Sequence, residues 1–267
     1  MNIVSEMLSF DFMQNAFVAG VALAICAALL GVCLVLRRNS MIGDGLSHAA
    51  FAAFAIAIVF GWMPLPFALV AVTLLSFAVL RLGRRHNGDA AIAILSAGSL
   101  AVGTFAISIT RGVNVDINSY LFGSILAVSG GEKWLALGLA FVMIGLFAMA
   151  FHRIFALTFD EPFARTVGVR TKFYDGLFAA ICSVVIVVGM RLLGSLLISA
   201  LIIFPALTAM RLARNFKETT ILAVIISVFT FVLGLSLSYL LSAPAGSTIV
   251  LIDLAVFALA CAVRKIC

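Results

Sequence analysis

Long apolar runs, rarely broken by a charge, constrain this chain more than any other feature of its sequence. A helix needs roughly 20 apolar residues to cross a bilayer, and nine runs of about that length follow one another. The sequence therefore predicts an all-α protein, a polytopic membrane bundle of about nine transmembrane helices. Eight is the alternative if the second or seventh run does not cross. The predicted spans are 12–36, 44–62, 64–81, 89–110, 133–152, 173–190, 192–211, 218–242 and 246–264.

Composition excludes most other classes of protein. The 267 residues are 64% hydrophobic and 10% charged, whereas soluble domains are about 45–50% apolar and about 25% charged. Nine spans use about 180 residues, so we expect residues 1–267 to form a single transmembrane domain without a soluble catalytic or nucleotide-binding domain. The net charge of +6 requires no nucleic-acid partner, because most of the basic residues lie at the ends of spans.

The sequence also lacks the motifs of an enzyme. It contains no G-x-x-x-x-G-K-[ST], so the chain cannot hydrolyse ATP by P-loop chemistry on its own, and it contains neither H-E-x-x-H nor G-x-S-x-G. Its five cysteines lie in or beside apolar runs at spacings that form no metal site, so we expect them to be buried. These observations predict a transport subunit with no enzymatic activity and no permanent cofactor.

The basic residues indicate how the chain crosses the membrane. If the N-terminus lies outside and the spans alternate, fourteen of the seventeen lysines and arginines face inside, and only Arg111, Lys133 and Arg191 face outside. Cytoplasmic loops of membrane proteins carry such an excess of basic residues. The N-terminus is therefore predicted to lie outside and the C-terminus inside.

The second span carries two ionisable residues, which are costly within a membrane and suggest a function. Asp44 and His48 are four positions apart, so they share one face of a helix. A carboxylate and an imidazole in this arrangement can ligate one divalent cation. The alternative is that Asp44 caps the helix and hydrogen-bonds a packed histidine, and the spacing alone leaves both interpretations open.

One such pair supplies only two of the four ligands that zinc usually takes. A two-fold homodimer with this helix at its axis would bring two carboxylates and two imidazoles together, and manganese or ferrous iron would also accept that set with added water. Asp253 in the last span is a further candidate, as a residue supporting the metal ligands, a partner of Arg191 or an interface group.

A short amphipathic helix is expected at about 158–170, in the segment between the fifth and sixth spans. Two acids and a proline mark its start, because acids suit the helix N-terminus and proline suits the first helical position. Two small residues, four positions apart, then give it a smooth face. Such a helix is either a docking site for a partner protein or a simple connection. The residues concerned are Asp160, Glu161, Pro162, Ala164 and Gly168.

Several blocks of the sequence resemble the membrane permease subunits of zinc/manganese ABC importers. They are LGVCLVLRRNSMIGDGLSH (30–48), SYLFGSILAVS (119–129), DEPFARTVGV (160–169) and GSLLISALIIFPALTA (194–209). They occur in the order expected for that family and extend over nearly the whole chain. The opening MLSFDFMQ (7–14) is closer to the zinc branch, so zinc is the favoured cargo and manganese or iron the alternative.

The resemblance implies a type II ABC importer fold in the cytoplasmic (inner) membrane of a prokaryote. It also implies a second copy of the chain, a separate cytoplasmic ABC ATPase and an extracytoplasmic metal-binding protein as partners. The family's metal-contacting Asp and His map onto Asp44 and His48, and its coupling helix onto 160–168. One departure is that the family usually has a glycine after the histidine, where this chain reads AAFAAFA. The main rival function is a proton-coupled secondary metal transporter that uses the same pair as a relay.

Overall fold

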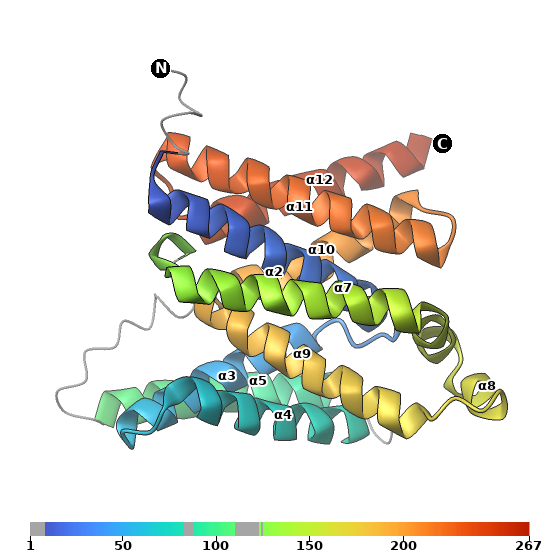
Figure 1. The fold of residues 1–267 in the computed structure, drawn as a ribbon, viewed down its shortest axis with the longest axis horizontal. Helices are drawn as coiled ribbons and strands as arrows, with labels where there is room; N and C mark the ends of the chain where they lie inside the picture. Colours follow the sequence, from blue (N-terminus) through green and yellow to red (C-terminus); the bar gives the residue numbers. More distant parts are fainter. Residues whose placement is uncertain (1–8, 83–87, 110–122, 124, 267) are drawn as a thin grey trace.

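A computed structural model of the chain describes residues 9–82, 88–109, 123 and 125–266. In this part of the chain the structure is helical and contains no strand (Figure 1). The long helices are α2 (Asp11–Leu36), α3 (Ile42–Val59), α4 (Pro64–Leu82), α5 (Gly88–Ile109), α7 (Gly130–Phe159), α9 (Thr171–Leu193), α10 (Ser195–Leu212), α11 (Phe216–Leu241) and α12 (Ala245–Ile266), and the short ones are η1 (Ile125–Ala127) and α8 (Glu161–Thr166).

Each of the nine predicted spans corresponds to one long helix. Eight helices in the described residues are long and apolar enough to cross a membrane, and the remaining long helix, α4, contributes a shorter apolar stretch, Pro64–Val79. The prediction of eight to nine membrane helices is therefore confirmed. The helix whose crossing is in doubt is α4, and not the second or seventh span as expected. Both α3 and α10 are long and apolar enough to cross, and α10 remains a helix through Pro205.

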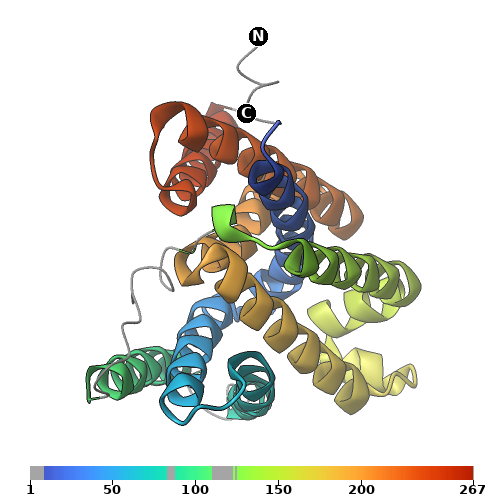
Figure 2. The same ribbon diagram turned by 60° about the vertical axis from the view of Figure 1, so that its left-hand side comes forward.

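Helix α2 lies at the centre of the bundle. It packs against α7, α9, α10 and α11, while α3, α4 and α5 form a group of their own that reaches the rest through α9 and α10 (Figures 1 and 2). Small residues permit these close approaches. A Cβ added at Gly31 would lie 1.9 Å from the carbonyl oxygen of Ile202, and one at Gly20 would lie 1.9 Å from the ring of Phe231.

Helix α7 is longer than the predicted span 133–152. It begins at Gly130 because Ser129 and Glu132 form a capping box, in which the Ser129 hydroxyl accepts from the Glu132 N–H and the Glu132 carboxylate accepts from the Ser129 N–H. Its last turns are stabilised by Phe155 and Phe159, whose rings pack against Phe216 of α11. The helix therefore continues beyond the apolar run to the start of α8.

Candidate metal site and coupling helix

Asp44 lies inside the first turn of α3 and does not cap it. The N-cap is Met41, whose side chain makes no capping hydrogen bond, and Asp44 is the third helical residue. The interpretation of Asp44 as the capping residue is therefore wrong. Its carboxylate instead interacts with two other side chains.

The carboxylate of Asp44 lies between a histidine and a serine. Its Oδ1 is 3.5 Å from Nε2 of His48, and its Oδ2 accepts a hydrogen bond of 3.0 Å from the Ser96 hydroxyl on α5. Two ligands held at about 2.1 Å by a tetrahedral metal lie about 3.4 Å apart. The separation of Oδ1 and Nε2 is therefore close to that of two atoms sharing one metal ion.

Both side chains are only partly covered. The exposed fraction is 36% for the Asp44 side chain and 16% for that of His48, so solvent or an ion reaches the carboxylate while the imidazole is mostly enclosed. The buried Nδ1 of His48 has no hydrogen-bond partner among the described residues. A mostly enclosed imidazole beside a charged carboxylate is chemically suited to bind a cation.

Close packing of α3 on α5 places Ser96 against Asp44. A Cβ added at Gly45 would lie 2.9 Å from Ile92, and one at Gly103 would lie 2.6 Å from the ring of Phe51. The contact between Gly103 and Phe51 concerns the stretch after His48, where the family usually has a glycine and this chain does not. Phe51 of the AAFAAFA stretch fills the space that Gly103 leaves on α5, so the two helices still pack closely.

In the part of the chain that the structure describes, one copy supplies only this pair. Within the described residues, no group of three or more histidines, cysteines, aspartates and glutamates could hold a metal ion. The cysteines Cys26, Cys33 and Cys182 are buried as expected, whereas Cys261 is partly exposed and Cys267 lies outside the described residues. Completion of the ligand set by a second copy stays a prediction.

Asp253 on α12 does not pair with Arg191. Arg191 binds Glu132 at 2.9 Å instead, which ties the end of α9 to the start of α7. The Asp253 carboxylate is buried, and neither of its oxygens has a hydrogen-bond partner among the described residues. The predicted ion pair is therefore wrong, and the other two roles of Asp253 stay predictions.

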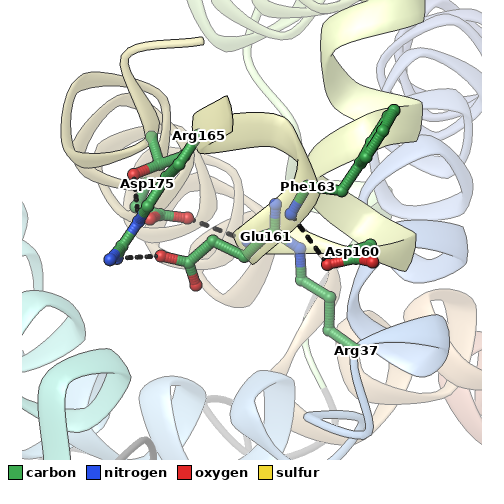
Figure 3. Close-up of polar contacts among 7 residues, drawn as sticks. Arg37, Asp160, Glu161, Phe163, Arg165 and Asp175 are labelled. Carbon is green, nitrogen blue, oxygen red and sulfur yellow. Dashed lines mark hydrogen bonds and ion pairs between the residues drawn. The ribbon is translucent and has the colours of Figure 1, made fainter. Parts of the chain in front are cut away.

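The short helix expected between the fifth and sixth spans forms, although it is shorter than 158–170. Asp160 is its N-cap and accepts a hydrogen bond of 2.9 Å from the N–H of Phe163 (Figure 3). Glu161 is the first helical residue and Pro162 the second, where a missing N–H is tolerated. One turn later, Arg165 donates to Glu161 at 2.5 Å.

The predicted smooth face of α8 does not form. Ala164 is fully buried, and Gly168 lies beyond the helix with a positive φ of 82°. The N–H of Gly168 bonds the carbonyl of Arg165 and the N–H of Val169 bonds that of Ala164, which is the hydrogen-bond pattern of a Schellman C-terminus. Gly168 therefore ends the helix.

The surface that α8 presents is apolar and aromatic. Phe163 is 60% exposed, and Val167, four positions later, is 62% exposed. This i, i+4 spacing of large apolar residues was the sequence signal for the exposed face of α8. The sequence prediction missed it because it relied on the two small residues instead. A partner protein would meet these two side chains.

A partly buried ion pair joins the end of α2 to the first turns of α9. Arg37, the C-cap residue of α2 five positions before α3, donates to Asp175 of α9 at 3.2 Å (Figure 3). Its guanidinium lies over the ring of Phe178. Sequence reasoning assigned Arg37 only to the basic residues at span ends. Its partner is 138 residues away, so no local pattern could reveal the pair.

Comparison with known proteins agrees with this architecture. Residues 9–264 match the family described as the ABC 3 transport family. A probable metal transport system membrane protein of Treponema pallidum is 34% identical, covering 97% of this chain and 98% of the relative. The manganese import system permease protein ScaB of Streptococcus gordonii is 30% identical, covering 93% and 90%. In the solved structure of PsaBC from Streptococcus pneumoniae in complex with Fab, the matching chain is 29% identical, with a TM-score of 0.85 and coverage of 97% and 95%.

Proposed function

The chain belongs to the ABC 3 transport family, and from this premise we propose that it is the permease subunit of an ATP-driven importer of divalent metal ions. The observation that carries the proposal is the Asp44–His48 pair, with 3.5 Å between Oδ1 and Nε2, on a helix apolar enough to cross a membrane. An ion in transit needs ligands that also release it, and two ligands per copy meet that need better than a closed site.

The metal is either manganese or zinc. The zinc-like opening of the sequence favoured zinc, whereas ScaB and several other relatives are named for manganese. One carboxylate and one imidazole per copy suit both ions, because zinc accepts four N and O ligands and manganese accepts the same set with added water. Manganese therefore fits the relatives at least as well as zinc, and competition between the two ions decides the question.

The proposed assembly contains two copies of this chain, a separate cytoplasmic ATPase and an extracytoplasmic metal-binding protein. The absence of a P-loop in the sequence requires the ATPase. Two Asp44–His48 pairs meeting at a two-fold axis supply two oxygens and two nitrogens. The excess of basic residues on the α8 side supports a cytoplasmic position for α8, where the ATPase would bind.

Transport proceeds by alternating access in this proposal. The metal-binding protein delivers the ion to the outer face, and the paired carboxylates and imidazoles hold it between the two copies. Closure of the ATPase dimer on ATP moves α8. Because Arg37 joins the end of α2 to Asp175 of α9, movement of the α8–α9 base is transmitted to the segment that leads into α3.

The test is uptake of radioactive manganese and zinc by the complete complex in proteoliposomes. His48→Ala is expected to abolish uptake while the complex remains assembled, and the exposed His152 gives the matched control, His152→Ala. Normal uptake by His48→Ala would remove the site. Omitting the ATPase separates the two transport classes, since uptake that persists without it would establish the proton-coupled alternative.

A further inference from the structure

Helices α7 and α9 form a wedge that opens toward α8. They lie close together near the start of α7 and diverge along their length, with α8 between their far ends and α2 behind them (Figures 1 and 2). Two adjoining hollows occupy this wedge, one apolar and one basic. Tyr174 of α9 lines both of them.

The apolar hollow follows the seam between the helices. Its walls include Leu146, Ala150 and Ile154 of α7 and Leu177, Phe178 and Ile181 of α9. The lining residues of α7 extend from Met143 to Leu157, a rise of about 21 Å, which is more than half of a hydrocarbon core of about 30 Å. The hollow encloses only about 40 Å³, so a hydrocarbon chain from one leaflet would lie along the open side of the seam and not inside a closed cavity.

The basic hollow lies at the α8 end of the same seam and has a volume of about 470 Å³. It is lined by Arg153, Arg170, Phe173, Tyr174 and residues 167–169 at the end of α8, with no acidic residue among its walls. The guanidinium of Arg153 donates to the Tyr174 hydroxyl and lies 5.7 Å from the centre of that ring. Its position is therefore fixed at the mouth of the apolar hollow.

The two arginines of this hollow differ from their basic neighbours. Arg37 is paired with Asp175 and Arg165 with Glu161, whereas no ion pair to a carboxylate forms at Arg153 or Arg170 within the described residues. Both are exposed. Two guanidiniums without an acid, in one concave site beside aromatic residues, attract an anion.

We propose that this seam binds an anionic phospholipid of the leaflet on the α8 side. Its phosphate lies in the basic hollow against Arg153 and Arg170, and one acyl chain runs along the apolar hollow. Basic pockets between membrane helices take acidic lipid headgroups, and aromatic residues lie at the same interface. A soluble protein would not fill an apolar hollow that continues into the membrane, which is why the occupant is a lipid and not the ATPase.

The lipid would brace the wedge that holds α8. α7 leads into α8 and α9 leads out of it, so an occupant between their ends would set the separation of the two arms. This inference concerns a different face from the metal pair on α3, and it stands whichever ion the protein carries.

The test uses the full chain purified in detergent and examined by native mass spectrometry. Phosphatidylglycerol is titrated as the anionic probe and phosphatidylcholine as the zwitterionic one. In the Arg153→Gln/Arg170→Gln variant, affinity for phosphatidylglycerol is expected to fall about 25-fold, roughly fivefold for each basic residue at the headgroup. Affinity for phosphatidylcholine should change little. Arg153→Lys/Arg170→Lys, which keeps the charge, should retain most of the binding.

The matched control is Arg214→Gln/Lys217→Gln. It removes the same charge from exposed residues between α10 and the first turn of α11, outside the seam. Equal losses in the two double variants would overturn the proposal, because they would reflect net charge alone.

Two further experiments identify the source of the anion and the role of the apolar hollow. Inorganic phosphate at millimolar concentration should not displace the lipid, because it lacks the acyl chain, and displacement would overturn the proposal. Ala150→Trp fills the apolar hollow and should weaken retention of both lipids. Loss of ATPase binding with unchanged lipid binding in Arg153→Gln/Arg170→Gln would assign the hollow to the partner protein and overturn the proposal.

Discussion

The candidate metal pair Asp44–His48 on α3 and the short helix α8 are built in opposite ways. At Asp44 the backbone is ordinary helix, and the chemistry depends on side chains held by the neighbouring helix α5. At α8 the backbone geometry defines the region, because Asp160 starts the helix and Gly168 ends it. The side chains of Phe163 and Val167 then lie exposed on its surface. Substitutions of side-chain chemistry should therefore dominate in the first region, and contact area and backbone geometry in the second.

The largest effect is expected from Asp44→Asn. The amide can still accept from Ser96, so packing is kept, but the negative charge and the anionic ligand are lost. Uptake should fall by about a hundredfold or more, since even residues that only support metal ligands cost about 10–100-fold. Metal uptake by the reconstituted complex measures this. Uptake by Asp44→Asn at the wild-type level would show that the pair has only a structural role. The proposed difference between the two regions would then be wrong.

A smaller effect is expected from Phe163→Ala on α8. Removal of an exposed aromatic anchor from an interface typically costs about 2 kcal/mol or more, which corresponds to about thirtyfold weaker ATPase binding. Titration of the ATPase against the permease in nanodiscs measures this affinity. Leu212→Ala, at the exposed end of α10, is the control and should change nothing. Equal losses in both variants would contradict a specific role for α8.

Ser96→Ala tests how far support from α5 matters. The hydroxyl fixes Oδ2 of Asp44 and leaves Oδ1 facing His48, so its loss should lower uptake about tenfold, the low end for residues that orient metal ligands. Ser108→Ala is the control, because Ser108 lies on the same helix and donates to the carbonyl of Thr104. A change confined to the apparent affinity for metal would support a role of Ser96 in orienting Asp44 for metal binding. No change would show that the Ser96 contact does not affect transport.

The smallest effect is expected from Gly168→Ala. The added Cβ meets no neighbour, but a φ of 82° is unfavourable for any residue with a side chain. Fraying of the end of α8 should cost about 1 kcal/mol, and uptake should fall about fivefold at unchanged metal affinity. Transport coupled to ATP hydrolysis is the measurement. A loss as large as that of Phe163→Ala would mean that Gly168 itself contacts the ATPase.

Some features of both regions were predictable because they depend on neighbours in the sequence. The spacing of Asp44 and His48 puts them on one face of any α-helix. In the same way, Asp160 followed by Glu161 and Pro162 predicts a helix start wherever it occurs. The error at α8 came from treating Gly168 as a helical surface residue. Its place next to a helix end equally allowed the left-handed conformation that glycine adopts there.

Other features depended on residues far apart in the chain. An ion pair with Arg191 was one of three roles considered for Asp253, yet Arg191 binds Glu132, since the start of α7 comes to lie beside the end of α9. Ser96 was not singled out from the sequence, although its hydroxyl donates a hydrogen bond to the Asp44 carboxylate. Both outcomes depend on which helices become neighbours.

The sequence by itself determined the membrane class, the nine long helices and the start of α8, because hydropathy and capping act over a few residues. The tertiary structure alone decided that Ser96 supports Asp44, that Arg37 reaches Asp175, and that α7 and α9 diverge around a seam of opposite chemistries. Contacts of this kind arise when helices separated by many residues pack, and that packing follows from shape complementarity over the whole bundle, which no short stretch of sequence contains.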